Sequence, residues 1–147
     1  MRTGIWRKLN GTPQFTGDRP AVAFETITIA HPKGRKRWNG GGKQAIWEVP
    51  IEINRSHAQK RLHTTQKPLQ LMNALIWDFT DAGETILDPF MGSGTTLIAC
   101  VRFQRQAIGI EVDENYFDIA CQRVRDAYAQ PSLFVPQPHM PQQATLI

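Results

Sequence analysis

Two features of the sequence have residue types and spacing suited to chemistry: a glycine-rich segment and a glutamate that follows it. The segment at 88–96 reads DPFMGSGTT, and its glycines permit positive φ and a close approach of the main chain to a ligand. The N–H groups of a helix that begins there can bind a carboxylate. Glu111 follows at a position where a carboxylate can accept hydrogen bonds from both ribose hydroxyls of a nucleoside. Together they predict a site for an adenosine-containing cofactor.

Other ligand-binding loops resemble this segment in part. The phosphate-binding loop of nucleoside triphosphatases has a lysine after its second glycine, where this chain has Thr95, so such a nucleotide is disfavoured. A dinucleotide-binding loop has a third glycine, where this chain has Leu97. The residues alone therefore favour an adenosine-containing cofactor, and they leave a dinucleotide and a turn without any ligand open.

The elements around the glycine segment predict how it is positioned. Residues 85–88 and 106–111 have the pattern of short buried strands, and 95–103 that of an apolar helix between them. Asp113 can cap a last helix whose apolar positions continue to about residue 128. The order strand, helix, strand, helix predicts a right-handed parallel βαβ unit with the glycine segment at its first turn.

Upstream of this unit the pattern predicts a helix and a pair of strands. Pro68 begins a run with apolar residues at helical spacing, which predicts a helix over 68–80. Residues 3–9 and 22–31 alternate as strands do, and we expect them to pair through a long polar loop. We expect residues 32–62 to form a loop with one short strand near Ala45–Val49.

Charge is distributed unevenly along the chain. The first 61 residues hold twelve Lys/Arg against four Asp/Glu, whereas the remaining residues hold five against nine. Clustered cations favour a polyanion because phosphate neutralisation releases counterions. A solvated basic surface is the equally open alternative.

Two linked motifs make the sequence recognisable. DPFMGSGTT, followed by IGIEVDENYFDIACQRV, resembles the cofactor motifs of the amino-directed DNA methyltransferases, and HTTQKP at 63–68 resembles the motif that precedes them in this family. The resemblance extends from Gly4 to about Ala129. It implies an α/β fold, namely a partial Rossmann-like methyltransferase fold made of a β-hairpin and a βαβα cofactor unit. It also implies transfer of a methyl group from S-adenosylmethionine to adenine N6 or cytosine N4 of double-stranded DNA, as in restriction–modification systems.

The resemblance also implies roles for single residues. Lys67 would pair with the methionyl carboxylate of the cofactor and Asp88 with its ammonium group, while Phe90 would lie near the sulfonium. Glu111 would take the ribose and Val112 would pack on the adenine. The full set of expected cofactor residues is Thr65, Gln66, Lys67, Asp88, Phe90, Gly92, Gly94, Glu111 and Val112.

In this family the region between the paired strands and the HTTQKP motif recognises the target, and here it is residues 32–62. The segment KGRKRWNGGGK within it suits that role. Phosphate contacts are expected from the four cations, and base contacts from the two residues with planar side chains. The cations are Arg35, Lys36, Arg37 and Lys43, and the planar residues are Trp38 and Asn39.

The catalytic tetrapeptide of the family, Asp/Ser/Asn-Pro-Pro-Tyr/Phe/Trp, is absent from the 147 residues, which contain no Pro-Pro. Family members use it to polarise the amino group of a flipped-out base. We therefore expect the central catalytic strands to be missing, no catalytic residue in this chain, and no methylation by the isolated chain. A truncated gene, one half of a split enzyme whose separate chain carries those strands, and a misassigned start codon are all open explanations. A non-catalytic DNA-binding module is the main alternative function, and a nicotinamide-dependent reductase is a more distant one.

The expected division of the chain is into paired strands at 1–31, a DNA-contacting region at 32–62, a cofactor unit at 63–130 and a disordered tail at 131–147. Cys100 and Cys121 lie in apolar stretches without metal-ligand spacing, so we expect buried reduced thiols and no metal site. No segment has the apolar length of a membrane span, and we expect a soluble cytoplasmic protein.

Overall fold

The computed structural model describes residues 1–11, 13–34, 36–52 and 66–130. Its elements follow the order β1 (Arg2–Arg7), β2 (Phe24–Ile29), β3 (Ile46–Glu48), α1 (Leu69–Phe79), β4 (Thr85–Asp88), α2 (Thr95–Arg102), β5 (Gln106–Gly109) and α3 (Glu114–Ala129). Each helix and strand expected from the sequence is present, with ends displaced by a few residues. The expected tail lies outside the described residues.

The first three strands form one sheet in the order β2-β1-β3. β1 and β2 pair antiparallel with Arg2 opposite Ile29, which confirms the predicted pair of strands. β3 confirms the predicted short strand, and it lies parallel to β1 with Trp6 opposite Trp47. Both indoles are nearly inaccessible, at 4% and 2% exposed, so the large aromatic residues supply the core of this small sheet.

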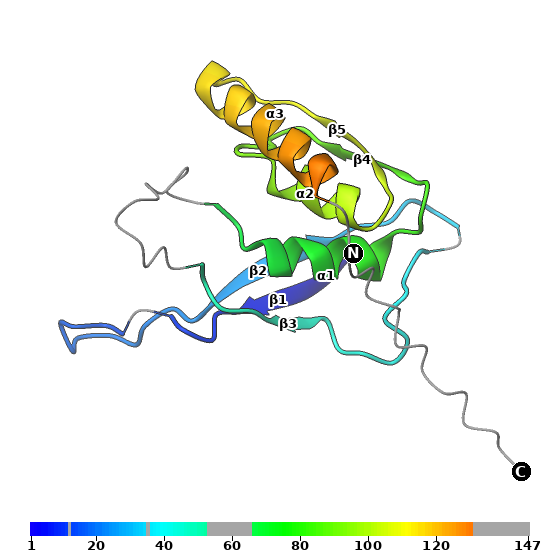
Figure 1. The fold of residues 1–147 in the computed structure, drawn as a ribbon. Coiled ribbons are helices and arrows are strands. Elements are labelled where there is room, and N and C mark those ends of the chain that lie inside the picture. The colour runs from blue at the N-terminus through cyan, green and yellow to red at the C-terminus, as the bar shows by residue number, and fades with distance from the viewer. Residues whose placement is uncertain (12, 35, 53–65, 131–147) are drawn as a thin grey trace, which may run out of the picture.

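Helix α1 lies between this sheet and the rest of the molecule (Figure 1). Leu71 packs into the cluster of Trp6 and Trp47, whereas Ile76 packs into a second cluster with Ala99 and Cys100 of α2. The two clusters draw on different faces of one helix, because residues five apart point in different directions at 3.6 residues per turn. α1 is therefore the element that joins the two halves of the fold.

The second half is the predicted βαβα unit. β4 and β5 are parallel, with Asp88 opposite Gly109, and α2 packs on them and against α3 (Figure 1). The predicted cap of the last helix is confirmed, since the Asp113 side chain accepts hydrogen bonds from the N–H groups of Asn115 and Tyr116. Cys100 is buried as expected, but Cys121 is partly exposed, and both are free.

Among the described residues, the sheet of β4 and β5 shares no strand pairing with the sheet of β1 to β3. One face of β4 and β5 is apolar and open, with Leu87 60%, Ile108 55% and Ile110 54% exposed. Exposed aliphatic side chains in neighbouring strand positions are typical of a sheet face that another element normally covers. The described residues thus form two small separate sheets, as expected for the partial Rossmann-like methyltransferase fold that the resemblance implies.

Candidate functional site: the glycine loop and the basic segment

The glycine loop between β4 and α2 is held by main-chain hydrogen bonds. The Met91 N–H donates to the Ile110 carbonyl at 3.0 Å, and the Gly94 N–H to that of Met91 at 2.9 Å. Gly92 and Gly94 have φ of 53° and 81°, a region that favours glycine. At Gly94 an added Cβ would lie 2.9 Å from the Ala120 Cβ of α3, so this glycine also permits close packing of the loop on that helix.

Glu111 closes the loop from the end of β5. One oxygen of its carboxylate accepts from the Gly92 N–H at 2.8 Å, and the other accepts from the N–H groups of Val112 and Asp113, both at 3.0 Å. The bonds from Asp113, Gly92 and Val112 lower the pKa of Glu111, because they favour the charged form. The glutamate that the sequence indicates as a ribose ligand thus already binds the glycine loop.

Asp88 and two apolar side chains lie around the same loop. The Asp88 carboxylate accepts from the Phe90 N–H at 3.1 Å, which shapes the turn. Phe90 is 89% exposed and Val112 is fully exposed. Large apolar groups that stand open beside carboxylates offer the mixed lining that a nucleoside-containing ligand needs.

Gln66 joins the upstream motif to the glycine loop. The Ser93 hydroxyl donates to the Gln66 Oε1 at 3.2 Å, and Ser93 itself is 4% exposed. The contact spans 27 residues of sequence. It brings together the two motifs that the sequence links only by resemblance. Thr65, the other polar residue expected here, lies outside the described residues.

Arg123 of α3 is a site residue that the sequence did not indicate. Its guanidinium donates to the Ser93 carbonyl and, at 2.8 Å, to the Ser93 hydroxyl. Burial lowers the pKa of Arg123, and the charge of Glu52 opposes that effect. Only its place on the inward side of an amphipathic helix hints at a role, and that signal does not name a partner 30 residues away.

Gly109 is the second residue that sequence reasoning missed. A Cβ at this position would lie 2.3 Å from the Met91 sulfur and 3.0 Å from a methyl carbon of Leu97. The glycine therefore lets the loop and α2 lie directly on β5. A signal was present in the sequence, because a glycine inside a strand often marks a close approach of another segment.

Lys67 points to a different partner from the expected cofactor carboxylate. Its ammonium group lies 2.6 Å from Glu25 of β2 and 5.6 Å from the centre of the Trp6 ring. Lys8 binds the other Glu25 oxygen at 2.9 Å. The hydrogen bonds from Lys67 and Lys8 lower the pKa of Glu25. Lys67 thereby fastens the motif before α1 to the first sheet.

Part of the basic segment, which is residues 33–43 before β3, is bound to α1 and to the turn that follows this helix. Arg37 forms ion pairs with Asp81 and Glu84, and the Lys43 ammonium lies 2.7 Å from Asp78. Asp78 is 3% exposed and also accepts from the Trp47 indole N–H at 2.7 Å. A buried carboxylate requires such partners. These two cations therefore contribute to the attachment of the segment.

Asn39 completes this attachment at the carboxyl end of α1. Its side-chain amide donates to the carbonyl oxygens of Trp77 and Thr80 at 3.1 and 2.9 Å and to Asp81 at 3.0 Å. Its main-chain N–H donates to the Asp78 carbonyl at 2.7 Å. The last carbonyls of a helix lack partners within the helix, and Asn39 supplies them here.

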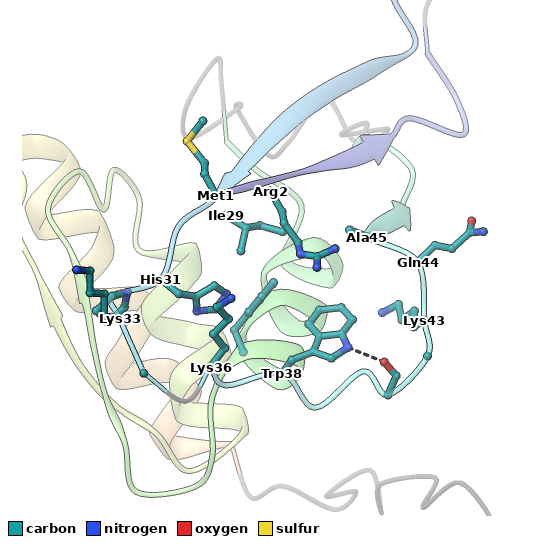
Figure 2. A pocket seen from close by; sticks show the side chains of 15 residues that line it. Met1, Arg2, Ile29, His31, Lys33, Lys36, Trp38, Lys43, Gln44 and Ala45 are labelled. Carbon is teal, nitrogen blue, oxygen red and sulfur yellow. Dashed lines mark hydrogen bonds between the residues drawn. The ribbon is translucent and has the colours of Figure 1, made fainter.

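Trp38 lies beside a hollow of about 1160 Å³ between the end of the β1–β2 pair and the basic segment (Figure 2). Its ring centre is 5.2 Å from that of Phe79, and its indole N–H donates to the Gly41 carbonyl at 2.7 Å. Arg2, Lys33 and Lys36 line the same hollow. Arg35, which was expected to bind phosphate, lies outside the described residues.

Metal centres and membrane-spanning helices were not found in the described part of the chain. Within it, no group of three or more His, Cys, Asp or Glu side chains is arranged to hold a metal ion. None of its helices has the length and apolar character needed to cross a bilayer.

Comparisons with known proteins identify the family of this chain. The DNA methylase family of N6/N4 methyltransferases matches residues 2–122. The type II methyltransferase M.HinfI of Haemophilus influenzae is 30% identical over 148 residues, which cover 87% of this chain and 40% of that protein. The type II methyltransferase M2.MboI of Moraxella bovis is 33% identical over 132 residues, which cover 82% of this chain and 48% of that protein.

A solved structure shows the same fold. The crystal structure of the M1.HpyAVI–SAM complex superposes with a TM-score of 0.68 at 30% identity, over 84% of this chain and 61% of that one. The chain thus spans less than half the length of the two curated relatives. Because the family match covers most of its residues, the chain belongs to the N6/N4 DNA methylase family.

Proposed function

We propose that this chain is the cofactor-binding and DNA-contacting part of an S-adenosylmethionine-dependent DNA methyltransferase that acts on the N6 of adenine or the N4 of cytosine. The observation that carries the proposal is the closed glycine loop. Glu111 holds it at Gly92, and Ser93 links it to Gln66 of the upstream motif. Family membership supports the reaction class.

The residues around the loop fit this cofactor. S-adenosylmethionine supplies a methyl group on a sulfonium, which is an electrophile. A carboxylate offers about four acceptor positions, and Glu111 uses three for main-chain N–H groups. It therefore accepts one ribose hydroxyl as it stands, and a second only after it releases an N–H group. The open side chain of Val112 offers a surface for the adenine, and Phe90 one for the sulfonium.

The methionine end of the cofactor is assigned to two further residues. The Asp88 carboxylate accepts one hydrogen bond from the Phe90 N–H, and its remaining acceptor positions can bind an ammonium group. Lys67 has to exchange its ion pair with Glu25 for the methionyl carboxylate. The exchange leaves Glu25 its ion pair with Lys8 at 2.9 Å, so this carboxylate is not left without a partner.

Transfer of the methyl group needs a catalytic segment that these 147 residues do not contain, because the family tetrapeptide is absent. We propose that the chain alone binds cofactor without methylating DNA. The open apolar face of Leu87, Ile108 and Ile110 supports this, since it offers a surface for the central strands. Those strands would belong either to a longer form of the protein or to a separate chain.

Cofactor binding is tested by isothermal titration calorimetry of the purified chain with S-adenosylmethionine, with NAD as the comparison ligand. We expect binding of S-adenosylmethionine only. Glu111→Ala should weaken it about tenfold or more, because loop bracing and the ribose contact are lost together. Glu114→Ala, an exposed glutamate on the first turn of α3, is the matched control and should bind as the unchanged chain does. Binding of NAD alone would instead indicate the nicotinamide-dependent reductase.

The lack of transfer is tested with a radiolabelled methyl group and double-stranded DNA of mixed sequence. We expect no label in DNA from the isolated chain. Label incorporated by this chain alone would refute the proposed inactivity. Salt-dependent DNA binding with no response to S-adenosylmethionine would favour the non-catalytic DNA-binding module.

A further inference from the structure

Five of the cations before β3 fall into two sets that the sequence does not distinguish. Arg37 and Lys43, the anchored cations, form ion pairs with carboxylates on or just after α1. Arg2, Lys33 and Lys36, the open cations, are exposed and have no ion pair with any carboxylate of the described residues. Because Lys33 and Lys36 lie within a few residues of Arg37 and Lys43, composition alone treats these four as equivalent.

The anchored cations attach the basic segment to carboxylates on or just after α1. Asp78 is almost inaccessible and takes the Lys43 ammonium and the Trp47 indole N–H together. Arg37 lies at the carboxyl end of α1, where positive charge is favoured by the helix dipole. Cations already neutralised by a carboxylate gain little from a phosphate, because the existing pair has to be broken first.

The open cations lie around one surface. Figure 2 shows Arg2 at the start of β1 together with Lys33 and Lys36 of the basic segment around the same hollow. Trp38 and Phe79 pack together beside them. Asn39 and the anchored cations attach the main chain of the basic segment to the carboxyl end of α1. The open cations have no ion-pair partner among the described residues.

We propose that this hollow binds the phosphate backbone of double-stranded DNA through the open cations, chiefly Lys33 and Lys36, whereas Arg37, Asn39 and Lys43 hold the segment on α1 and do not contact DNA. The inference rests on the proposed function, since it assumes a DNA partner. It adds Arg2 and Lys33 to the DNA surface and assigns three of the residues expected there to the support behind it. Each unpaired lysine that meets a phosphate releases a counterion, which favours binding.

The test compares two double variants that each remove two positive charges: Lys33→Ala with Lys36→Ala, and Arg37→Ala with Lys43→Ala. Binding of the full chain to a fluorescent DNA duplex is followed by anisotropy over a range of salt concentrations. The first variant should lower the slope of log affinity against log salt by about 1.8, at about 0.9 for each lost phosphate contact. The second should keep the slope of the unchanged chain and should instead lower the melting temperature.

Each outcome decides a different point. Equal losses of slope in the two variants, at a temperature where circular dichroism shows both folded, would overturn the division into open and anchored cations. A larger loss in the second variant would reverse it. No salt-dependent binding of duplex DNA by the unchanged chain would refute DNA contact by this chain, and with it the DNA part of the proposed function. The first two outcomes leave that proposed function intact.

Discussion

The glycine loop and the basic segment are both irregular regions attached to helices, but they are held by different means. The glycine loop follows mainly from main-chain conformation, with positive φ at Gly92 and Gly94 and a bond from the Met91 N–H to the Ile110 carbonyl just after β5. The basic segment is held by side chains, with Asp78 at the centre of its contacts. A loop built from main-chain geometry tolerates few residue types at fixed positions, whereas one built from side-chain contacts depends on partners far away in the sequence.

The comparison predicts the largest effect for Gly94→Ala. A side chain there has an unfavourable φ of 81° and a Cβ 2.9 Å from that of Ala120, so the free energy of unfolding should fall by about 2–4 kcal/mol. Gly92→Ala is the matched control. It has an unfavourable φ of 53° but meets nothing within 4 Å, so about 1–2 kcal/mol is expected. Urea denaturation measures both, and equal losses would mean that packing on α3 does not constrain the loop.

The basic segment should be most sensitive at Asp78. Asp78→Ala leaves the buried Trp47 indole N–H without its acceptor, and we expect the free energy of unfolding to fall by about 1–3 kcal/mol. The control is Glu48→Ala, which breaks an exposed ion pair with Arg7 and should cost about 0–1 kcal/mol. Thermal denaturation followed by tryptophan fluorescence reports on both. A loss at Asp78 no larger than that at Glu48 would contradict the anchoring role.

Substitution of Arg123 tests whether its guanidinium helps to hold the glycine loop. Arg123→Ala removes the guanidinium that binds the Ser93 carbonyl and hydroxyl, and we expect about tenfold weaker binding of S-adenosylmethionine, since hydrogen bonds to charged groups contribute about 1.5–3 kcal/mol. Arg123→Lys should restore part of the affinity. The control Arg125→Ala changes an exposed arginine of the same helix. Calorimetry in which the Arg123 and Arg125 variants bind alike would show that the Arg123 guanidinium does not hold the loop.

The smallest effect concerns Glu25, through which Lys67 joins the upstream motif to β2. Its pKa is lowered in the folded protein from 4.5 by Lys67 and Lys8, so its contribution to stability is present above pH 4.5 and is lost as the pH falls through the lowered pKa. The difference in unfolding free energy between the unchanged chain and Glu25→Gln should be constant near neutral pH and shrink in acid. A variant that also lacks both lysines should show no such change. A difference that persists unchanged at pH 3 would exclude this linkage.

The sequence predicted most of the elements and the place of the glycine loop, because these depend on local patterns. Pro68 before α1, the apolar spacing within the helices and Asp113 at the start of α3 each act over a few residues. The pairing of β1 with β2 was also predictable from two alternating stretches. The parallel position of β3 beside β1 was not, since three residues carry too little pattern to choose a neighbour.

The site was predicted in part for the same physical reason. The place of Glu111 beside the glycine loop was predictable, because its position relative to a strand end is local. The partners of Lys67, Asn39 and Arg123 lie 30 or more residues away. Many alternative partners of the right charge exist for each of them, and only the folded chain selects one. Residue type thus indicated that these side chains would bind something, but it did not indicate what.

The position of α1 has a consequence for the reach of the whole unit. Its amino end follows Gln66 and Lys67 of the cofactor motif, and its carboxyl end is capped by Asn39 of the basic segment. Eleven residues at about 1.5 Å each give a helix roughly 16 Å long, so the length of α1 fixes the distance between the two regions. One inserted residue would lengthen it slightly and turn one end relative to the other by about 100°. The helix therefore sets both the spacing and the relative orientation of the upstream motif and the basic segment.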